Sequence, residues 1–233
     1  MIFSLPLIPG TLIKRYKRFL ADIELKDGTI ITAHCPNSGS MLGCNTPGSK
    51  VLISYHNNPN RKYPYSWEMV KVDSGWVGIN TMIPNKLVAE SIEKGLIPEL
   101  VDYEKLFTEI RVSQHSRLDL MLQRENELCY VEIKNVSLVQ NGVALFPDAV
   151  TKRGAKHLQE LITLKEQGNR AVIFFLIQRQ DGESFKPADH IDPEYGKMLR
   201  NAFSKGVEIL PYRAIVNPEE IRIDKKLDFS FDN

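Results

Sequence analysis

Two short segments of the chain carry acidic and basic side chains at a spacing suited to phosphodiester chemistry. The first reads RLDL at residues 117–120 and the second reads VEIKN at residues 131–135. Each alternates apolar and charged residues, a pattern typical of a β-strand. Glu132 and Lys134 are two residues apart and therefore leave the same face of their strand. Asp119, Glu132 and Lys134 brought together could bind a divalent metal and orient a water molecule.

The polar connection at residues 124–127 predicts that the two segments form a hairpin. Asp119 would then stand beside Glu132, within reach of one shared cation. Mg²⁺ suits such a pair, because it takes one or two carboxylates and completes its shell with water and substrate phosphate; Mn²⁺ is the alternative. Lys134 would hold the attacking water or the developing negative charge. The competing interpretation is a solvated cross-strand ion pair, since short motifs match often by chance.

A helix predicted over residues 148–167 supplies two further candidates for catalysis. Arg153 and His157 lie four residues apart, on one edge of the apolar arc. Arg153 is suited to a bidentate phosphate contact, and His157 to the same contact or to proton transfer near neutral pH. An ordinary boundary between helix and solvent is the competing interpretation. The predicted apolar arc consists of Val150, Leu158, Leu161 and Ile162.

Glu90 is a candidate third carboxylate for the metal. It lies on a helix predicted over residues 85–94, just before the first of the charged strands. A helical wheel points Glu90 away from Leu87, Val88 and Ile92, so a solvent-facing side chain fits the pattern equally well.

The first eighty residues predict an all-β domain. Turn signals containing glycine, proline or asparagine separate short runs rich in β-branched and aromatic residues. A five-stranded, nucleic-acid-binding barrel of OB type fits this pattern, and a small sandwich fits it nearly as well. The predicted strands cover residues 19–25, 29–34, 50–56, 66–72 and 76–80.

The character of the chain changes near Pro84, where helices begin to alternate with strands. Residues 171–178 form a continuous apolar run, as expected for a strand buried on both faces. We therefore predict an α/β chain of the α+β two-domain type, with an all-β domain at 1–82 and a mixed sheet flanked by helices at 83–233. Further strands are predicted at 108–112, 118–123, 129–136 and 207–211, and a further helix at 193–205.

The charge distribution limits how this chain could bind DNA. Its formal net charge is only +1 over 233 residues, so any attraction to nucleic acid must be local. Arg61 and Lys62 lie near Tyr63 and Tyr65, which combines charge with stacking surface, as in single-strand binders. A solvated basic loop is the competing interpretation. Basic residues cluster at Lys14, Arg15, Lys17 and Arg18, at Arg61 and Lys62, and at Lys152, Arg153 and Lys156.

A small polar loop is a second candidate for contact with DNA. Asn37, Ser38, Gly39 and Ser40 include one glycine, and their backbone N–H groups could approach a phosphate closely. A purely structural turn is the alternative.

The sequence indicates a cytoplasmic protein. The first ten residues lack the basic start of a signal peptide, and no apolar run approaches the roughly 18 residues of a membrane span. Three cysteines without a CxxC pair argue against a disulfide framework or structural zinc. No heptad or large apolar patch can be read, so a homodimer stays an open alternative.

The charged segments resemble the PD-(D/E)XK nuclease superfamily, with Asp119, Glu132 and Lys134 at its motif positions and Leu118 where a proline is usual. The chain as a whole resembles the sugar fermentation stimulation protein A family from about residue 5 to 215. The segments that carry this resemblance are AHCPNSGSM at 33–41, RKY at 61–63, VGINT at 77–81, RLD at 117–119 with VEIKN at 131–135, and FPDAVTKRG at 146–154.

This resemblance implies an N-terminal OB-like domain and a C-terminal nuclease-like domain. It also implies a bacterial or archaeal cytosolic protein that binds DNA and is linked to sugar-utilisation genes. The leading hypothesis is a DNA-binding protein with a divalent-metal phosphodiesterase site. The alternatives are a regulatory DNA-binding protein that keeps the nuclease fold without turnover, and an enzyme acting on a small phosphorylated substrate.

Overall fold

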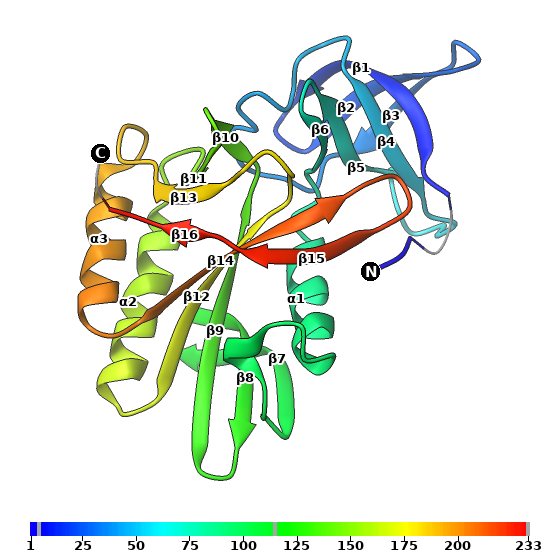
Figure 1. The fold of residues 1–233 in the computed structure, drawn as a ribbon. Helices are drawn as coiled ribbons and strands as arrows, with labels where there is room; N and C mark the ends of the chain where they lie inside the picture. Colours follow the sequence, from blue (N-terminus) through cyan, green and yellow to red (C-terminus); the bar gives the residue numbers. More distant parts are fainter. Residues whose placement is uncertain (4–5, 114–115, 232–233) are drawn as a thin grey trace.

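The structure is a computed structural model that describes residues 1–3, 6–113 and 116–231. A small barrel forms the N-terminal part, and a mixed sheet with helices forms the remainder (Figure 1). This confirms the predicted fold class. The predicted domains, 1–82 and 83–233, include residues 4–5, 114–115 and 232–233, which lie outside the described part.

Five strands close the barrel. They pair in the order β3-β2-β1-β4-β5, and β3 pairs in parallel with β5 through Ala33 and Tyr65. This is the strand order of an OB fold, and closure removes the sheet edges that would otherwise stay unpaired. A further strand, β6, forms a hairpin with β5. The strands are β1 (Ile8–Tyr16), β2 (Leu20–Leu25), β3 (Ile30–His34), β4 (Lys50–Tyr55), β5 (Tyr65–Val72) and β6 (Gly75–Gly78).

The sequence prediction missed β1 and counted β6 as the fifth barrel strand. Pro9 and Gly10 stand near the start of β1 and are poor strand formers. The strand forms because β2 and β4 pair with it on both sides. Gly10 is required there, since a Cβ at this position would lie 2.5 Å from Cγ2 of Ile23.

A six-stranded mixed sheet forms the centre of the second part. Its order is β15-β14-β12-β9-β8-β7, and β12 runs parallel to both of its neighbours. Every residue of β12 from Ala171 to Ile177 is buried, as the continuous apolar run predicted. The strands are β7 (Lys105–Ser113), β8 (Ser116–Arg124), β9 (Glu127–Val136), β12 (Arg170–Ile177), β14 (Glu208–Val216) and β15 (Ile221–Lys226).

Helices cover both faces of this sheet. The helix α1 (Ile83–Glu93) packs on one face together with Leu52 and Met69 of the barrel. On the other face lie α2 (Lys152–Glu166) and α3 (Pro193–Ser204), side by side in Figure 1. A four-stranded sheet and one 3-10 turn complete the fold: β10 (Leu138–Gln140), β11 (Val143–Phe146), β13 (Ser184–Pro187), β16 (Asp228–Phe229) and η1 (Pro98–Leu100). The sequence prediction had missed these short strands and β15.

The helix α2 begins four residues later than predicted. Thr151 caps it, because its side chain accepts a hydrogen bond from the N–H of Gly154 at 3.0 Å. Val150 therefore precedes the helix and is 70% exposed, so its predicted place in the apolar arc is wrong. Leu158, Leu161 and Ile162 are buried as predicted.

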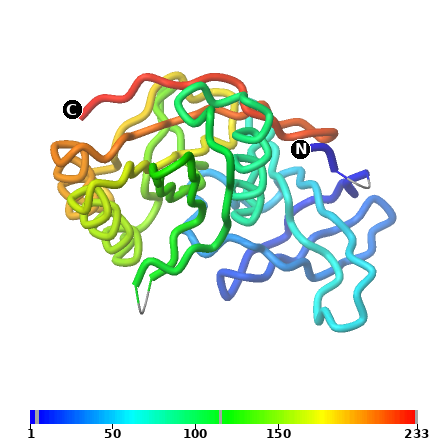
Figure 2. Tube along the Cα trace, turned by 90° about the horizontal axis from the view of Figure 1, so that it is seen from below, coloured from blue at the N-terminus to red at the C-terminus, as the bar shows by residue number. Residues whose placement is uncertain are grey.

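The start of the chain lies against the second sheet rather than the barrel. The N–H of Ile221 donates to the carbonyl of Met1 at 3.0 Å, and Ile2 forms a bridge with Glu220. Figure 2 shows this end beside the red segment near the C-terminus. None of the helices in the described ranges is both long and apolar enough to cross a membrane.

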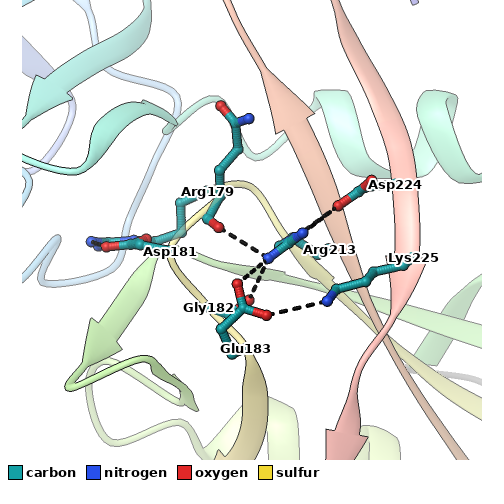
Figure 3. A network of polar contacts seen from close by, with 8 residues as sticks. Arg179, Asp181, Gly182, Glu183, Arg213, Asp224 and Lys225 are labelled. Carbon is teal, nitrogen blue, oxygen red and sulfur yellow. Dashed lines mark hydrogen bonds and ion pairs between the residues drawn. The ribbon is translucent and has the colours of Figure 1, made fainter.

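Gln178 joins the barrel to the second sheet. Its carbonyl accepts from the N–H of Gly78 at 2.9 Å, and its side chain donates to Asn135 at 2.6 Å. The segment after Gln178 is held by Arg213, which donates to Gln180, Gly182 and Glu183 and forms an ion pair with Asp224 (Figure 3). The junction is therefore anchored to β14 and β15.

This close approach makes the absence of a side chain at residue 78 essential. A Cβ on Gly78 would lie 2.5 Å from Oε1 and 2.9 Å from Cδ of Gln178, which is fully buried. We expect Gly78→Ala to lower the free energy of unfolding by about 1–3 kcal/mol, the usual cost of overpacking. Urea denaturation of the wild type and the variant measures this difference in the free energy of unfolding. Gly182→Ala is the control, because its Cβ would find its nearest atom at 3.3 Å; equal losses in both variants would contradict this account.

Candidate metal and phosphate site

Asp119 sits where the pairing between β8 and β9 ends. The last paired residues are Leu120 and Val131, and beyond them Oδ2 of Asp119 accepts a hydrogen bond from the N–H of Ile133 at 2.7 Å. The other oxygen, Oδ1, accepts from the side chain of Asn85 on α1 at 2.7 Å. The Asp119 carboxylate thus takes the place of a backbone carbonyl as the acceptor for Ile133, and hydrogen bonds from β9 and α1 hold it in position.

Glu132 and Lys134 leave the same face of β9, as the alternation predicted. Nζ of Lys134 lies 2.6 Å from Oε1 of Glu132. The same oxygen meets Nδ1 of His157 on α2. Glu132 is only 2% exposed, and its second oxygen, Oε2, has no hydrogen-bond partner among the described residues. One carboxylate oxygen is therefore strongly held while the other stays available to a ligand.

Arg153 and His157 extend this chain of contacts along α2. Nε of Arg153 donates to Nε2 of His157 at 3.4 Å. Nε2 of His157 accepts this hydrogen bond, and Nδ1 is the ring atom directed at Glu132. His157 is buried and Arg153 is exposed, so the pair leads from the buried carboxylate to solvent.

The two carboxylates have opposite electrostatic environments. Burial, with the nearby charge of Glu132, raises the pKa of Asp119 to about 6. Burial acts in the same direction on Glu132, but the hydrogen bond from His157 and the charge of Lys134 outweigh it and lower the pKa of Glu132. Glu132 is therefore the more acidic member of the pair.

A cavity of about 600 Å³ connects these side chains with the barrel. From the second domain, Asp119, Glu132, Lys134, Arg153 and His157 line it. The barrel contributes the loop from Asn37 to Ser40, together with Arg15 and Arg18. The structure thus brings the predicted catalytic residues and the predicted loop to one space.

The remaining predicted site residues do not line this cavity. Glu90 forms an ion pair with Lys94 at 2.5 Å and lines a neighbouring cavity of about 480 Å³, beside Asp119. Arg61 and Lys62 lie on the barrel, where Arg61 donates to Ser66. The other two predicted site residues, Lys152 and Lys156, are exposed on α2.

The loop from Asn37 to Ser40 is built differently from an open phosphate loop. Its N–H at Gly39 already donates to the side chain of Asn37. The guanidinium of Arg15 donates hydrogen bonds to the carbonyls of Asn37, Gly39 and Ser40. At the far end, Ser40 Oγ donates to the carbonyl of Asp148 at 2.5 Å, and the next N–H, of Met41, donates to the Asp148 carboxylate at 2.8 Å. We call the Ser40–Met41–Asp148 contact the clasp.

Sequence reasoning missed Arg15, Arg18, Asn85 and Asp148 as parts of the site. Arg15 and Arg18 were noticed only as members of a basic cluster. Asn85 and Asp148 sit within predicted helices, and nothing in their spacing indicated partners 34 and 107 residues away. Only tertiary contacts reveal their roles.

The donor set fits a hard divalent cation. Asp119 and Glu132 supply two carboxylates. The buried Oε2 of Glu132 has no hydrogen-bond partner among the described residues. No cluster of three or more histidine, cysteine or acidic side chains suited to a metal occurs within residues 1–3, 6–113 and 116–231. Two carboxylates match the ligand pattern of Mg²⁺ or Ca²⁺, in which water and phosphate complete the shell.

Fold and site together define a two-domain protein, in which an OB barrel shares a carboxylate-lined cavity with a mixed α/β domain. Two family models match in the same arrangement: SfsA N-terminal OB domain over residues 13–79, and Sugar fermentation stimulation protein RE domain over residues 82–220. The chain belongs to the sugar fermentation stimulation protein family.

Relatives match over nearly the whole chain. The sugar fermentation stimulation protein homolog of Geotalea uraniireducens is 58% identical over 227 residues, covering 97% of this chain and 98% of the relative. The homolog of Geobacter sulfurreducens is 56% identical, covering 97% of each. The structure of Pyrococcus furiosus SfsA in complex with Ca²⁺ superposes with a TM-score of 0.90 at 29% identity, covering 99% of this chain and 98% of that one.

The raised pKa of Asp119 predicts a pH-dependent cost in the metal-free protein. Its ordinary pKa is 3.8, so the folded state favours the proton and loses stability as the pH rises from about 4 through about 6. In EDTA at pH 8, we expect Asp119→Asn to raise the free energy of unfolding by about 2 kcal/mol, and the gain to vanish near pH 4.

Denaturation at several pH values measures this difference. Asp27→Asn is the control, because Asp27 is fully exposed and its pKa is lowered by hydrogen bonds from Thr29. A gain for Asp119→Asn that is the same at pH 4 and pH 8 would contradict the electrostatic origin.

Proposed function

We propose that this protein binds DNA and hydrolyses its phosphodiester bonds with a divalent cation, Mg²⁺ or Mn²⁺, held by Asp119 and Glu132. The observation that carries the proposal is the shared cavity, which Asp119 and the buried Glu132 line together with arginines of a nucleic-acid-binding type of barrel. Sites that act on phosphate need both signs of charge, because anionic ligands hold the metal and cationic groups hold the substrate.

The relative in complex with Ca²⁺ supports the cation. Asp119 and Glu132 would hold it, and the unpartnered Oε2 of Glu132 is the oxygen best placed to do so. When bound, a divalent cation polarises the phosphate and lowers the pKa of a bound water.

The chain's own side chains account for the rest of the chemistry. The Lys134 ammonium stands beside Glu132 and would stabilise negative charge that develops on the phosphate. Arg153 is exposed on the cavity wall and suits a bidentate phosphate contact. His157 positions Glu132 through Nδ1, so its first role in this structure is to orient the carboxylate.

Cation binding tests the metal part of the proposal on its own. Calorimetric titration with Ca²⁺, and separately with Mn²⁺, should show one site in the wild type. Glu132→Gln and Asp119→Asn should weaken it by about tenfold or more, because ligand charge sets affinity for hard cations. Glu125→Gln is the matched control, since Glu125 is exposed in the turn between the same two strands. Unchanged affinity in Glu132→Gln would assign the cation to another place.

Cleavage tests the activity. Single-stranded, duplex and branched DNA are incubated with and without Mg²⁺ or Mn²⁺. We expect Glu132→Gln and Lys134→Ala to lose about a hundredfold or more of the rate, the scale for removing a group that stabilises transition-state charge. Glu125→Gln should cut like the wild type.

Two outcomes would contradict the proposal in different ways. DNA binding that weakens steeply with salt, without cleavage of any substrate, would indicate a regulatory protein that keeps the fold. Absence of DNA binding at low salt would leave an enzyme that acts on a small phosphorylated compound.

A further inference from the structure

The cavity is small for a nucleic-acid site. Its volume of about 600 Å³ falls within the 300–1,000 Å³ of pockets that enclose one small ligand. A space of this size takes a nucleotide-sized piece of substrate. We expect a duplex to reach the carboxylates only if the barrel and the second domain move apart.

The clasp opposes such a movement. Its two hydrogen bonds join the barrel to Asp148, and Asp148, Gly39 and Ser40 all line the cavity. The contact is tight, because a Cβ on Gly39 would lie 2.7 Å from a carboxylate oxygen of Asp148. The wall of the cavity is therefore closed on this side by a direct contact between domains.

A continuous series of side chains leads away from the cavity over the barrel. Arg18 lines the cavity, and Phe19 follows it in the turn between β1 and β2 with 51% of its surface exposed. The carbonyl of Phe19 accepts from the N–H of Cys35 at 2.7 Å, and His34 pairs with Leu20. Phe19 and His34 thus lie at the same end of the β2–β3 pair.

The series continues onto β5 and the loop before it. His34 pairs in parallel with Ser66, and Arg61 donates to Ser66 Oγ at 3.0 Å. Burial, followed by the charge of Arg61, lowers the pKa of His34, which favours a neutral ring. Beside Ser66, the rings of Tyr65 and Tyr55 lie 5.3 Å apart, and Tyr55 is 46% exposed. From the cavity outwards the series therefore holds one arginine followed by two rings, and then a second arginine followed by two rings.

We propose that single-stranded DNA lies along this series, which we call the barrel track (Arg18, Phe19, His34, Arg61, Tyr65 and Tyr55), and enters the cavity by one end, while duplex DNA is excluded. Arginines that follow the backbone, together with rings on which bases stack, are the features that bind single strands without sequence preference. The inference deepens the proposed function and rests on it for the identity of the substrate. It gives Arg61, which lies outside the cavity, a place on the path of the strand.

The test measures binding apart from cleavage. A fluorescent twenty-residue thymidine strand and a blunt duplex of equal length are titrated into the full chain in EDTA and in Ca²⁺. We expect the single strand to bind at least about tenfold more tightly than the duplex, since stacking contributes substantially for each base. Equal affinities would overturn the proposal.

Variants locate the strand on the barrel. Phe19→Ala and Arg61→Ala should each weaken single-strand binding by about fivefold or more, and Phe19→Leu should weaken it although it keeps an apolar side chain. Matched controls are Phe107→Ala on β7 and Arg222→Ala on β15, which replace exposed residues of the same types away from the track. Thermal melting confirms that each variant is folded. Wild-type affinity in both Phe19→Ala and Arg61→Ala would overturn the assignment.

The failure of the activity and the failure of the track remain distinguishable. A single strand that binds along the track and is never cut would leave the track intact and remove the nuclease. Duplex cleavage as fast as single-strand cleavage would keep the nuclease and overturn the track.

Discussion

The buried carboxylate of Glu132 is the constraint on which the second domain depends. A charge that is 2% exposed is costly unless donors surround it. Lys134 can help because it leaves the same face of β9, but the second donor, His157, comes from α2. The helix must therefore lie at one height above the sheet, which the packing of Leu158 and Leu161 maintains. Even so, Oε2 remains without a partner among the described residues, so the site keeps a cost that a ligand would relieve.

A second chain of hydrogen bonds connects the barrel to that same helix. Arg15 donates to carbonyls of the loop from Asn37 to Ser40. Ser40 and Met41 in turn donate to Asp148 in the clasp. Three residues further on, Thr151 caps α2, while its own N–H donates to Asp192, the cap of α3. The barrel is thus linked to the beginnings of both helices. The helix α2 also carries His157, so the barrel and the Glu132 site share this structural element.

The sequence predicted the elements whose reasons are local and missed those whose reasons are tertiary. Alternation along β8 and β9 identified Asp119, Glu132 and Lys134, because apolar residues at every second position of these strands pack into the core. The unbroken apolar run of β12 likewise followed from burial on both faces. In contrast, β1 contains a proline and a glycine and is stabilised by its neighbours. Asn85 and Arg15 carry no local signature at all, since their partners lie far along the chain.

A nearly neutral protein can suit a polyanion when short-range contacts, rather than long-range attraction, provide the binding. With a formal net charge of +1, long-range attraction contributes little, and binding must come from short-range contacts. The cavity concentrates them, because Lys134, Arg153 and Arg18 line it together with the half-buried Asp119 and the buried Glu132. Opposite charges in one enclosed space interact more strongly than on an open surface, because less water screens them. With the proposed cation held by Asp119 and Glu132, such a site would favour a phosphate group that enters the cavity and contacts the cation and the arginines together.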